Sequence, residues 1–346
     1  MKVLHISHHI GCMRDHAYIY ETLGFEYEFW KFPKGLFFVT KYISNEMWNE
    51  RKEYFNSFDY IVTSDTAPLS RIFMENVNEL VPKVIVWICN RFDYSMESDS
   101  SFYELFNKIS IEHKDKFKII PYSDFEGVWC KHKEIQHTLE TITPIGINLD
   151  KLDYKIDGLN DLQNSYTHDA NSKETYEEPC SLRNKMFIPI YSNDNLFFDL
   201  KYIFQVNNID YFNGGYKQSS DLKHCKAFVT FPDSFSKLMT FETIQNEVIV
   251  FLPSEHFLIR LHKLKNNNIQ YWFNCPLGYL NSELIKYCEW YKFKECRIYF
   301  ESIDDLIYKI NTLSPDTIEE KRKWCRYYGE IIKNTNMEKW KNAFEL

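Results

Sequence analysis

Short apolar segments alternate with longer amphipathic stretches along most of this chain, and this rhythm constrains the fold more than any other feature. Apolar segments of about four to eight residues, separated by stretches with helical periodicity, are typical of βαβ units that build a parallel sheet. Strands are expected at 2–9, 25–32, 59–65, 83–90 and 117–123, and again at 186–192, 209–213, 227–232 and 247–253. The doubled pattern predicts two α/β domains.

Helical segments are predicted between these strands and at the C-terminus. They are expected at 13–23 (closed by Gly24), from Pro68, at 197–208, at 303–313 and from Thr317 to the end. The first strand is not followed by Gly-x-Gly-x-x-Gly, so the usual dinucleotide fingerprint is missing.

The composition changes between the two halves. Residues 151–185 are rich in Asn, Asp, Ser and Glu and poor in aliphatic residues, which predicts a linker or surface insertion. We therefore expect an N-terminal Rossmann-like domain at 1–148, a polar linker or insertion at 149–185, a C-terminal Rossmann-like domain at 186–325 and a closing helix at 326–346. Ligands of such folds bind at the carboxyl ends of the strands, so the site is expected in a cleft there.

Charge and cysteine usage exclude several classes of protein. The net charge of −8 and the pI near 5.8 argue against a nucleic-acid partner, because binding phosphate backbones needs basic surface. The nine cysteines are scattered and include no Cys-x-x-Cys pair, so neither a disulfide framework nor a zinc site is expected. The start MKVLHISHHI is too short and polar for a signal peptide, and no apolar run reaches the length of a membrane span. A cytoplasmic protein without a transmembrane segment is predicted.

The stretch FPDSFSKLMTFETIQ (231–245) suggests a binding site at the end of a strand. Ser234, Ser236 and Lys237 stand where a helix is expected to start, and backbone N–H groups beside a lysine attract phosphate oxygens. Glu242 lies inside that helix, where a carboxylate can accept hydrogen bonds from two ribose hydroxyls. The alternative is that Ser236 caps the helix and Glu242 is solvated. The stretch alone leaves both interpretations open.

A diphosphate bound there would need further cationic or backbone groups. Lys237 is our first choice, and Lys217, which follows Gly214 and Gly215, is the second. Gly215 is also a candidate for nucleotide binding.

Three residues that follow strands of the first half are candidates for a catalytic base. Asp93 ranks first, since it follows the apolar VIVWI, although it could equally form a structural ion pair with Arg91. His9 ranks second because histidine titrates near neutral pH; capping or packing is the alternative. Asp65 ranks third, with capping of the next helix as its alternative. The segment SDFEG (123–127) could also border the cleft.

The second half carries a pattern that is similar to a known family. A strand, a proline, a small polar loop, an aromatic residue before Glu242, a helix and a strand ending in Pro-Ser follow one another. This order resembles the donor-binding core of GT-B glycosyltransferases, in particular the group with a Glu-x7-Glu motif, whose second glutamate contacts the donor ribose and matches Glu242. The first glutamate would fall at Ser234, so the chain has no counterpart of it.

Other segments share the resemblance. TPIGINLD (143–150) resembles the Pro-Asn-Gly-Val-Asp segment with which such enzymes leave their first domain, and the closing helices resemble those that cross back to it. The chain also resembles glycosyltransferases of algae and of large DNA viruses, which would place it in a host cytoplasm if it is viral. The resemblance implies a GT-B fold, with two Rossmann-like domains facing across a cleft, and transfer of a sugar from a nucleoside-diphosphate sugar to a hydroxyl of a glycan or other acceptor.

The expected chemistry needs no metal or other cofactor. Enzymes with the GT-A fold bind a metal through Asp-x-Asp, and the sequence contains no Asp-x-Asp. The nucleotide-sugar donor is then a substrate, and its diphosphate depends on basic side chains and helix starts.

Other functions stay open at this point. On the same fold, a nucleotide-sugar epimerase or a DNA-modifying glucosyltransferase is an alternative, although DNA modification would want a strongly basic cleft. From another class, the chain could be a non-catalytic nucleotide- or sugar-binding module. An enzyme slowly cleaves its donor without acceptor, whereas a binding module leaves it intact.

Overall fold

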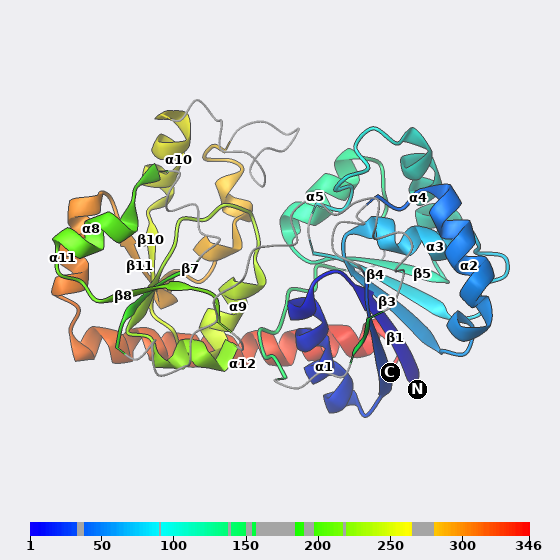
Figure 1. The fold of residues 1–346 in the computed structure, drawn as a ribbon, viewed down its shortest axis with the longest axis horizontal. Helices are drawn as coiled ribbons and strands as arrows, with labels where there is room; N and C mark the ends of the chain where they lie inside the picture. Colours follow the sequence, from blue (N-terminus) through cyan, green and yellow to red (C-terminus); the bar gives the residue numbers. More distant parts are fainter. Residues whose placement is uncertain are drawn as a thin grey trace. The chain divides into compact units, whose positions relative to one another are not determined.

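The structure is a computed structural model, and it describes residues 1–32, 38–89, 91–137, 140–149, 154–156, 184–189, 197–216, 219–264 and 280–346. The chain divides into two compact units (Figure 1). Unit 1 comprises residues 1–144, 149–171 and 334–346, and unit 2 comprises residues 145–148 and 172–333.

Unit 1 contains a six-stranded sheet in the order β5-β4-β3-β1-β2-β6. All five pairings are parallel, as the alternation of strand and helix predicts. The strands are β1 (Lys2–Ser7), β2 (Glu26–Lys31), β3 (Tyr60–Asp65), β4 (Lys83–Ile88), β5 (Phe117–Pro121) and β6 (Tyr154–Ile156). The first five confirm the predicted strands of the first half.

Helices connect these strands and cover the sheet. They are α1 (Ile10–Leu23), α2 (Lys41–Phe55), α3 (Arg71–Met74), α4 (Ser100–Glu112) and α5 (Asp124–His132). Gly24 ends α1 with φ of 69°, a left-handed conformation that glycine adopts without a Cβ penalty, so the predicted closure is confirmed. The helix predicted from Pro68 is a 3-10 turn at 67–70 that continues into the short α3.

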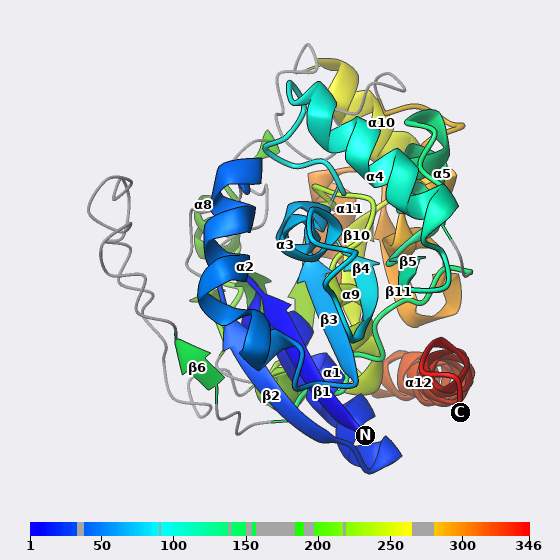
Figure 2. The same ribbon diagram turned by 90° about the vertical axis from the view of Figure 1, so that its right-hand side faces the viewer.

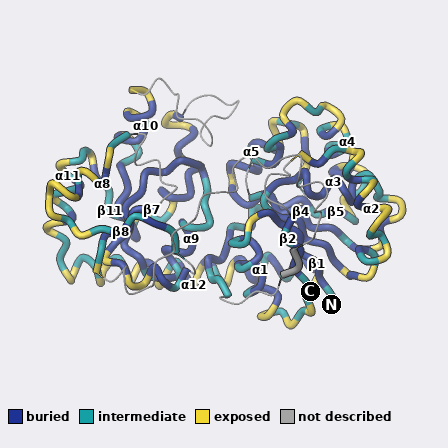
Figure 3. Tube along the Cα trace, in the orientation of Figure 1, coloured by how far each residue is buried: buried dark blue, intermediate teal, exposed yellow. Residues whose placement is uncertain are grey.

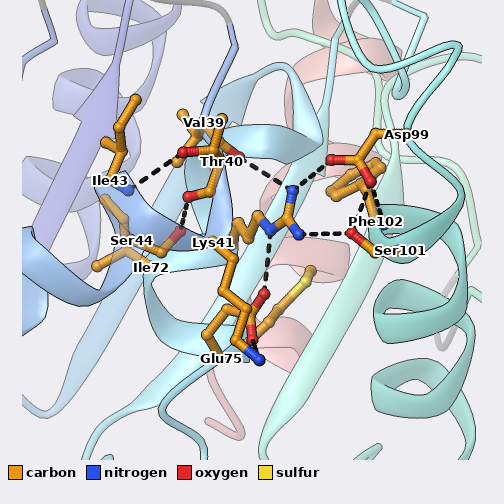
Figure 4. Close-up of polar contacts among 12 residues, drawn as sticks. Val39, Thr40, Lys41, Ile43, Ser44, Ile72, Glu75, Asp99, Ser101 and Phe102 are labelled. Atoms are coloured by element: carbon orange, nitrogen blue, oxygen red, sulfur yellow. Dashed lines mark hydrogen bonds and ion pairs between the residues drawn. The ribbon is translucent and has the colours of Figure 1, made fainter.

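Arg71, the first residue of α3, joins this helix to α4 and to the segment before α2. Figure 4 shows the residues that it contacts, among them Val39, Glu75 and Asp99. Its buried guanidinium forms ion pairs with Asp99 at 2.7 Å and with Glu75 at 3.1 Å, and donates to the carbonyl of Val39 at 3.3 Å. Asp99 is also the N-cap residue of α4. Because removal of one partner would leave a buried charge, this network holds the segments that follow β3 and β4.

Unit 2 contains a five-stranded parallel sheet in the order β11-β10-β9-β7-β8. The strands are β7 (Met186–Pro189), β8 (Tyr211–Gly214), β9 (Ala227–Val229), β10 (Val250–Pro253) and β11 (Arg297–Phe300). The first four confirm predicted strands. β1, β3, β4 and β5 of unit 1 and β7, β9 and β10 of unit 2 are largely buried (Figure 3). In unit 2 the core includes Ile188, Val229, Phe231, Phe251 and Phe300.

The helices of unit 2 are α8 (Leu200–Val206), α9 (Leu238–Gln245), α10 (Glu255–Leu264) and α11 (Ile303–Asn311). The last helix, α12 (Pro315–Ala343), is continuous over 29 residues. Its residues up to Lys333 belong to unit 2, and the chain from Asn334 onward belongs to unit 1. In unit 1, the ring centroid of Trp340 lies 4.7 Å from that of His16 in α1. Asn336 Nδ2 donates to the carbonyl of Thr143 at 2.8 Å.

The division of the chain differs from the predicted domain bounds in two ways. Residues 154–156 of the predicted linker form β6, which pairs with β2 at the edge of the first sheet (Figure 2). The segment 145–148, expected at the end of the first domain, belongs to unit 2 because it packs on α9. The placement of β6 in the first sheet and of 145–148 in unit 2 both depend on contacts with residues far away in the sequence.

The two sheets share one strand order. Numbered within each unit, the first five strands run 2-1-3-4-5 in both. In this order the direction of the connections reverses between the first and third strands, and ligands bind at the carboxyl ends of the strands beside that point. The residues after β1 and β3 in unit 1, and after β7 and β9 in unit 2, are therefore the places to examine.

Candidate functional site

The loop between β9 and α9 carries most of the predicted binding residues of unit 2. Lys237 is the N-cap residue of α9, and its Nζ forms an ion pair with Asp233 Oδ2 at 2.5 Å. Ser234 Oγ donates to the carbonyl of Ser236 at 3.1 Å. The hydroxyl of Ser236 is buried and has no hydrogen-bond partner within the described ranges. The alternative that Ser236 caps the helix is wrong, because the N-cap residue of α9 is Lys237 and no side-chain hydrogen bond caps this helix.

Glu242 is buried inside α9, with only 3% of its surface exposed. Its Oε1 accepts a hydrogen bond from Asn148 Nδ2, and its Oε2 accepts one from the hydroxyl of Tyr216. A buried carboxylate is costly unless donors surround it, and these two donors come from distant segments of unit 2. The alternative that Glu242 is a solvated helix residue is therefore wrong.

The hydrogen bond between Tyr216 and Glu242 lies beside the point where the strand order of unit 2 reverses. Tyr216 follows β8, α9 follows β9, and β7 lies between these two strands in the sheet. The ring centroid of Tyr216 lies 6.1 Å from the ring centroid of Phe187 in β7. Sequence reasoning placed Glu242 correctly in the helix but missed both of its partners, for which no local signal exists.

Gly146 brings the segment 145–148 against α9. Its φ is 82°, and a Cβ at this position would lie 2.4 Å from the carbonyl carbon of Phe241 and 2.8 Å from the amide nitrogen of Glu242. Gln245 Nε2 donates to the carbonyl of Ile145 at 2.9 Å. Only glycine fits this close approach of two backbones, which places Asn148 beside Glu242.

The remaining predicted residues of unit 2 lie near this group. Gly215 follows β8 directly, is partly exposed and precedes Tyr216. Lys217 lies outside the described residues, so its predicted contact with a diphosphate stays a prediction.

In unit 1, Asp93 lies after β4 and is 1% exposed. Its Oδ2 accepts a hydrogen bond from the hydroxyl of Tyr103 at 2.7 Å, and its Oδ1 accepts one from Trp129 Nε1 at 3.1 Å. Arg91 Nε forms an ion pair with the same Oδ1 at 2.8 Å. The ion pair that the sequence left open is thus present, in a network that fixes the orientation of Asp93.

Glu126 is a second buried carboxyl group near Asp93, and sequence analysis assigned it no role beyond its place in SDFEG. It is 5% exposed, and its Oε2 accepts a hydrogen bond from the amide of Phe92 at 3.2 Å. Burial and the negative charge of Asp93 raise the pKa of Glu126 to about 8. A carboxyl group with a raised pKa beside a second buried carboxyl group is an arrangement often found in acid–base catalysis.

His9 and Asp65 lie at the ends of β1 and β3, the reversal point of the first sheet. His9 is exposed and is the N-cap residue of α1, but its side chain makes no cap hydrogen bond. Asp65 has φ of 83°, uncommon for a residue other than glycine, and it does not cap the next turn, whose N-cap is Thr66. Burial and the nearby Cys12 raise the pKa of Asp65 to about 7. The capping interpretation of Asp65 is wrong.

No family model matches the chain, and no curated protein matches its sequence. Solved structures match it in fold. One is a Listeria monocytogenes protein assigned as a UDP-N-acetylglucosamine 2-epimerase, with a TM-score of 0.52 and 10% identity over 99% of this chain and 96% of that chain. Another, a UDP-N-acetylglucosamine 2-epimerase, has a TM-score of 0.45 and 8% identity over 93% of this chain and 90% of the other. At 10% identity the first match is evidence for the fold alone, and the second is too distant to add to it.

The chain has the GT-B type of fold: two α/β units, each with a parallel sheet, and a C-terminal helix that contributes residues to both. The predicted fold class is thereby confirmed, while the cleft expected between the two domains stays a prediction. Of the helices within the described ranges, none combines the length and apolar character of a transmembrane span.

Proposed function

We propose that this chain is an enzyme that acts on a nucleoside-diphosphate sugar and binds the nucleotide through unit 2. The observation that carries the proposal is the buried Glu242, held by Asn148 and Tyr216 beside the reversal point of the second sheet. A carboxylate can accept about four hydrogen bonds, so two ribose hydroxyls can join or replace these donors. Both segments that resemble GT-B glycosyltransferases, 143–150 and 214–254, contribute to this group.

The start of α9 is the proposed diphosphate site. Lys237 supplies a positive charge, Ser236 supplies a buried hydroxyl, and the first N–H groups of the helix point toward the loop. Asp233 currently pairs with Lys237, so a bound diphosphate would compete with Asp233 for that ammonium group.

Acid–base chemistry is assigned to unit 1. Asp93 remains the first candidate for the base, before His9 and Asp65. Glu126 is added as the candidate acid because its raised pKa favours the protonated form. Glu126 lies close enough to Asp93 for the charge of Asp93 to raise the pKa of Glu126, and both side chains are buried, which favours this pair over the exposed His9.

Two reactions fit a carboxyl pair of this kind. Epimerisation removes a proton from a sugar carbon and returns one on the other face; the matched Listeria monocytogenes structure, assigned as a UDP-N-acetylglucosamine 2-epimerase, favours this reaction. Transfer of the sugar to a hydroxyl needs a base for that hydroxyl, and the sequence resemblance to GT-B glycosyltransferases favours this second candidate. We place epimerisation first because the structural match extends over nearly the whole chain.

A two-stage experiment tests the proposal. A thermal-shift screen of UDP-, GDP-, CMP- and TDP-sugars comes first, since a ligand at a hundred times its dissociation constant stabilises the folded state by about 2.7 kcal/mol. The sugar that binds is then incubated with enzyme in D2O and followed by NMR. Deuterium at a sugar carbon together with a second epimer indicates epimerisation, whereas transfer to an added glycan, or slow hydrolysis without deuterium, indicates a glycosyltransferase. An intact, undeuterated donor would leave only a binding module, and absence of any binding would refute the proposal.

A further inference from the structure

Two cysteines that are far apart in the sequence meet at the carboxyl edge of the first sheet. Cys12 lies in the first turn of α1, and Cys89 follows β4 directly. Their Sγ atoms are 3.8 Å apart, and both are free thiols. Cys12 is 4% exposed, whereas Cys89 is partly exposed.

The backbone around both residues is held in place. The amide of Cys12 donates to the carbonyl of His9 at 3.1 Å, and the amide of Cys89 donates to the carbonyl of Asp65 at 3.1 Å. A disulfide has an S–S length of about 2.0 Å, so the two sulfur atoms, now 3.8 Å apart, must approach each other by about 1.8 Å for a disulfide to form.

The surroundings of Cys12 favour its thiolate. A hydrogen bond with Cys89, aided by His9 and Ser64, lowers the pKa of Cys12 to about 5, although burial acts in the opposite direction. The start of a helix also stabilises a negative charge. The other charged group that faces this thiol is Asp65 at the end of β3, whose pKa is raised to about 7.

We propose that Cys12 and Cys89 are a modification site at which a small peroxide converts the two thiols into an intramolecular disulfide. The oxidant must be small because Cys12 is almost fully buried. Within the described part of the chain no three His, Cys, Asp or Glu side chains are grouped as metal ligands. The inference does not depend on the proposed function.

The chemistry balances with the peroxide as the only co-reactant. The Cys12 thiolate attacks one peroxide oxygen, the O–O bond breaks, and Cys12 becomes a sulfenic acid while hydroxide leaves. Cys89 then loses its proton to that hydroxide and attacks the Cys12 sulfur, which releases the sulfenic oxygen as a second hydroxide. This hydroxide becomes water by taking up the proton that Cys12 released to solvent when it formed its thiolate. Two thiols are oxidised and one peroxide is reduced to two water molecules.

Mass spectrometry of the full-length protein after treatment with hydrogen peroxide tests the proposal. The wild type should yield a peptide pair joined through Cys12 and Cys89, which dithiothreitol separates. Cys89→Ser should instead accumulate a sulfenic acid at Cys12 that dimedone traps, because no second thiol can resolve it. Cys12→Ser should give neither product at Cys89. Cys130→Ser is the matched control, since Cys130 is buried in the same unit and burial raises its pKa; it should behave as the wild type.

The pH dependence of the oxidation provides a second measurement. The rate at Cys12 should change less than about threefold between pH 8 and pH 6, whereas a thiol of ordinary pKa would slow by roughly two orders of magnitude. Either of two results would overturn the proposal: no joined peptide pair while other cysteines are oxidised, or an ordinary pH dependence at Cys12 together with no dimedone adduct in Cys89→Ser.

Discussion

The two sheets have the same strand order, but the carboxyl groups at their carboxyl edges have different surroundings. In unit 1, burial changes the acidity of Asp65 and Glu126, whose pKa values rise to about 7 and about 8. In unit 2, the buried Glu242 is surrounded by donors instead, and Asp233 is paired with Lys237. One topology thus supports an edge that can exchange protons and an edge that presents fixed hydrogen bonds.

The difference lies in what accompanies each carboxyl group when it is buried. Desolvation favours the protonated acid unless hydrogen bonds or positive charges compensate for it. Glu126 accepts a single backbone hydrogen bond and lies near the charge of Asp93. Glu242 accepts from two side chains. This difference is consistent with the proposal that unit 1 transfers protons and unit 2 binds the nucleotide, and four substitutions test it.

The largest effect is expected for Gly146→Ala. The new Cβ would meet the backbone of α9 at 2.4 Å, and φ of 82° is strained for alanine, so the segment bearing Asn148 should leave α9. We expect a loss of about 4 kcal/mol or more in the free energy of unfolding, measured with urea. Gly24→Ala is the control, since φ there is 69° but no atom lies within 4 Å, and it should cost about 1–2 kcal/mol. Equal losses in the two variants would show that the close approach is unimportant.

Glu242→Ala is expected to have the next largest effect. Removal of the carboxylate leaves Asn148 and Tyr216 without their buried acceptor, which should cost about 2–3 kcal/mol of stability. Calorimetric titration should also show nucleoside diphosphates binding on the order of tenfold to a hundredfold more weakly. Tyr216→Phe separates the two roles, because it removes one donor and keeps the carboxylate. A Glu242→Ala protein with unchanged affinity would contradict the proposed ribose contact.

Glu126→Gln should alter the dependence of stability on pH. The pKa of Glu126 rises from 4.5 in the unfolded chain to about 8 in the folded protein, so between these values the folded state binds more protons. The stability contributed by the protonated acid is full below pH 4.5 and is lost as pH rises through about 8, with a slope of up to about 1.4 kcal/mol per pH unit. The variant should lose less stability than the wild type between pH 5 and pH 8 in urea titrations. Parallel curves would mean that Glu126 titrates normally.

Lys237→Ala should change stability least. The ion pair with Asp233 is partly exposed on the lysine side, so its loss should cost about 1 kcal/mol or less. Affinity for a nucleoside diphosphate should nevertheless fall more than affinity for the nucleoside alone, since the proposed partner is phosphate. Calorimetry with both ligands checks this, and an equal decrease for the two would assign Lys237 no role toward phosphate.

The strands were predictable because their signal is local. VIVWI in β4 and the apolar run in β10 are buried on both sides, as in sheets covered by helices on both faces, and Gly24 ended α1 where it was expected. β6 was missed because only its pairing with β2 distinguishes it from the polar segment around it.

The candidate site was predictable only in part. The position of Glu242 in a helix after a strand followed from the sequence, but Asn148 lies 94 residues away and Tyr216 lies 26 residues away. Glu126 stands three residues after Ser123, a pattern that indicates a helix cap, and its amide does donate to Ser123 Oγ at 3.3 Å. Its carboxylate, however, faces Phe92 and the charge of Asp93, which no local pattern predicts.

The periodicity of strands and helices can be read from the amino-acid sequence alone, and it predicts two parallel α/β units and the position of Glu242 in α9. Hydrophobic periodicity and capping act over a few residues, so they can be recognised along the chain. The burial of Glu242 between Asn148 and Tyr216, the raised pKa of Glu126 and the contact of Cys12 with Cys89 follow only from the folded structure. These properties depend on desolvation and on neighbours brought together by the sheet order, and both exist only in the folded chain.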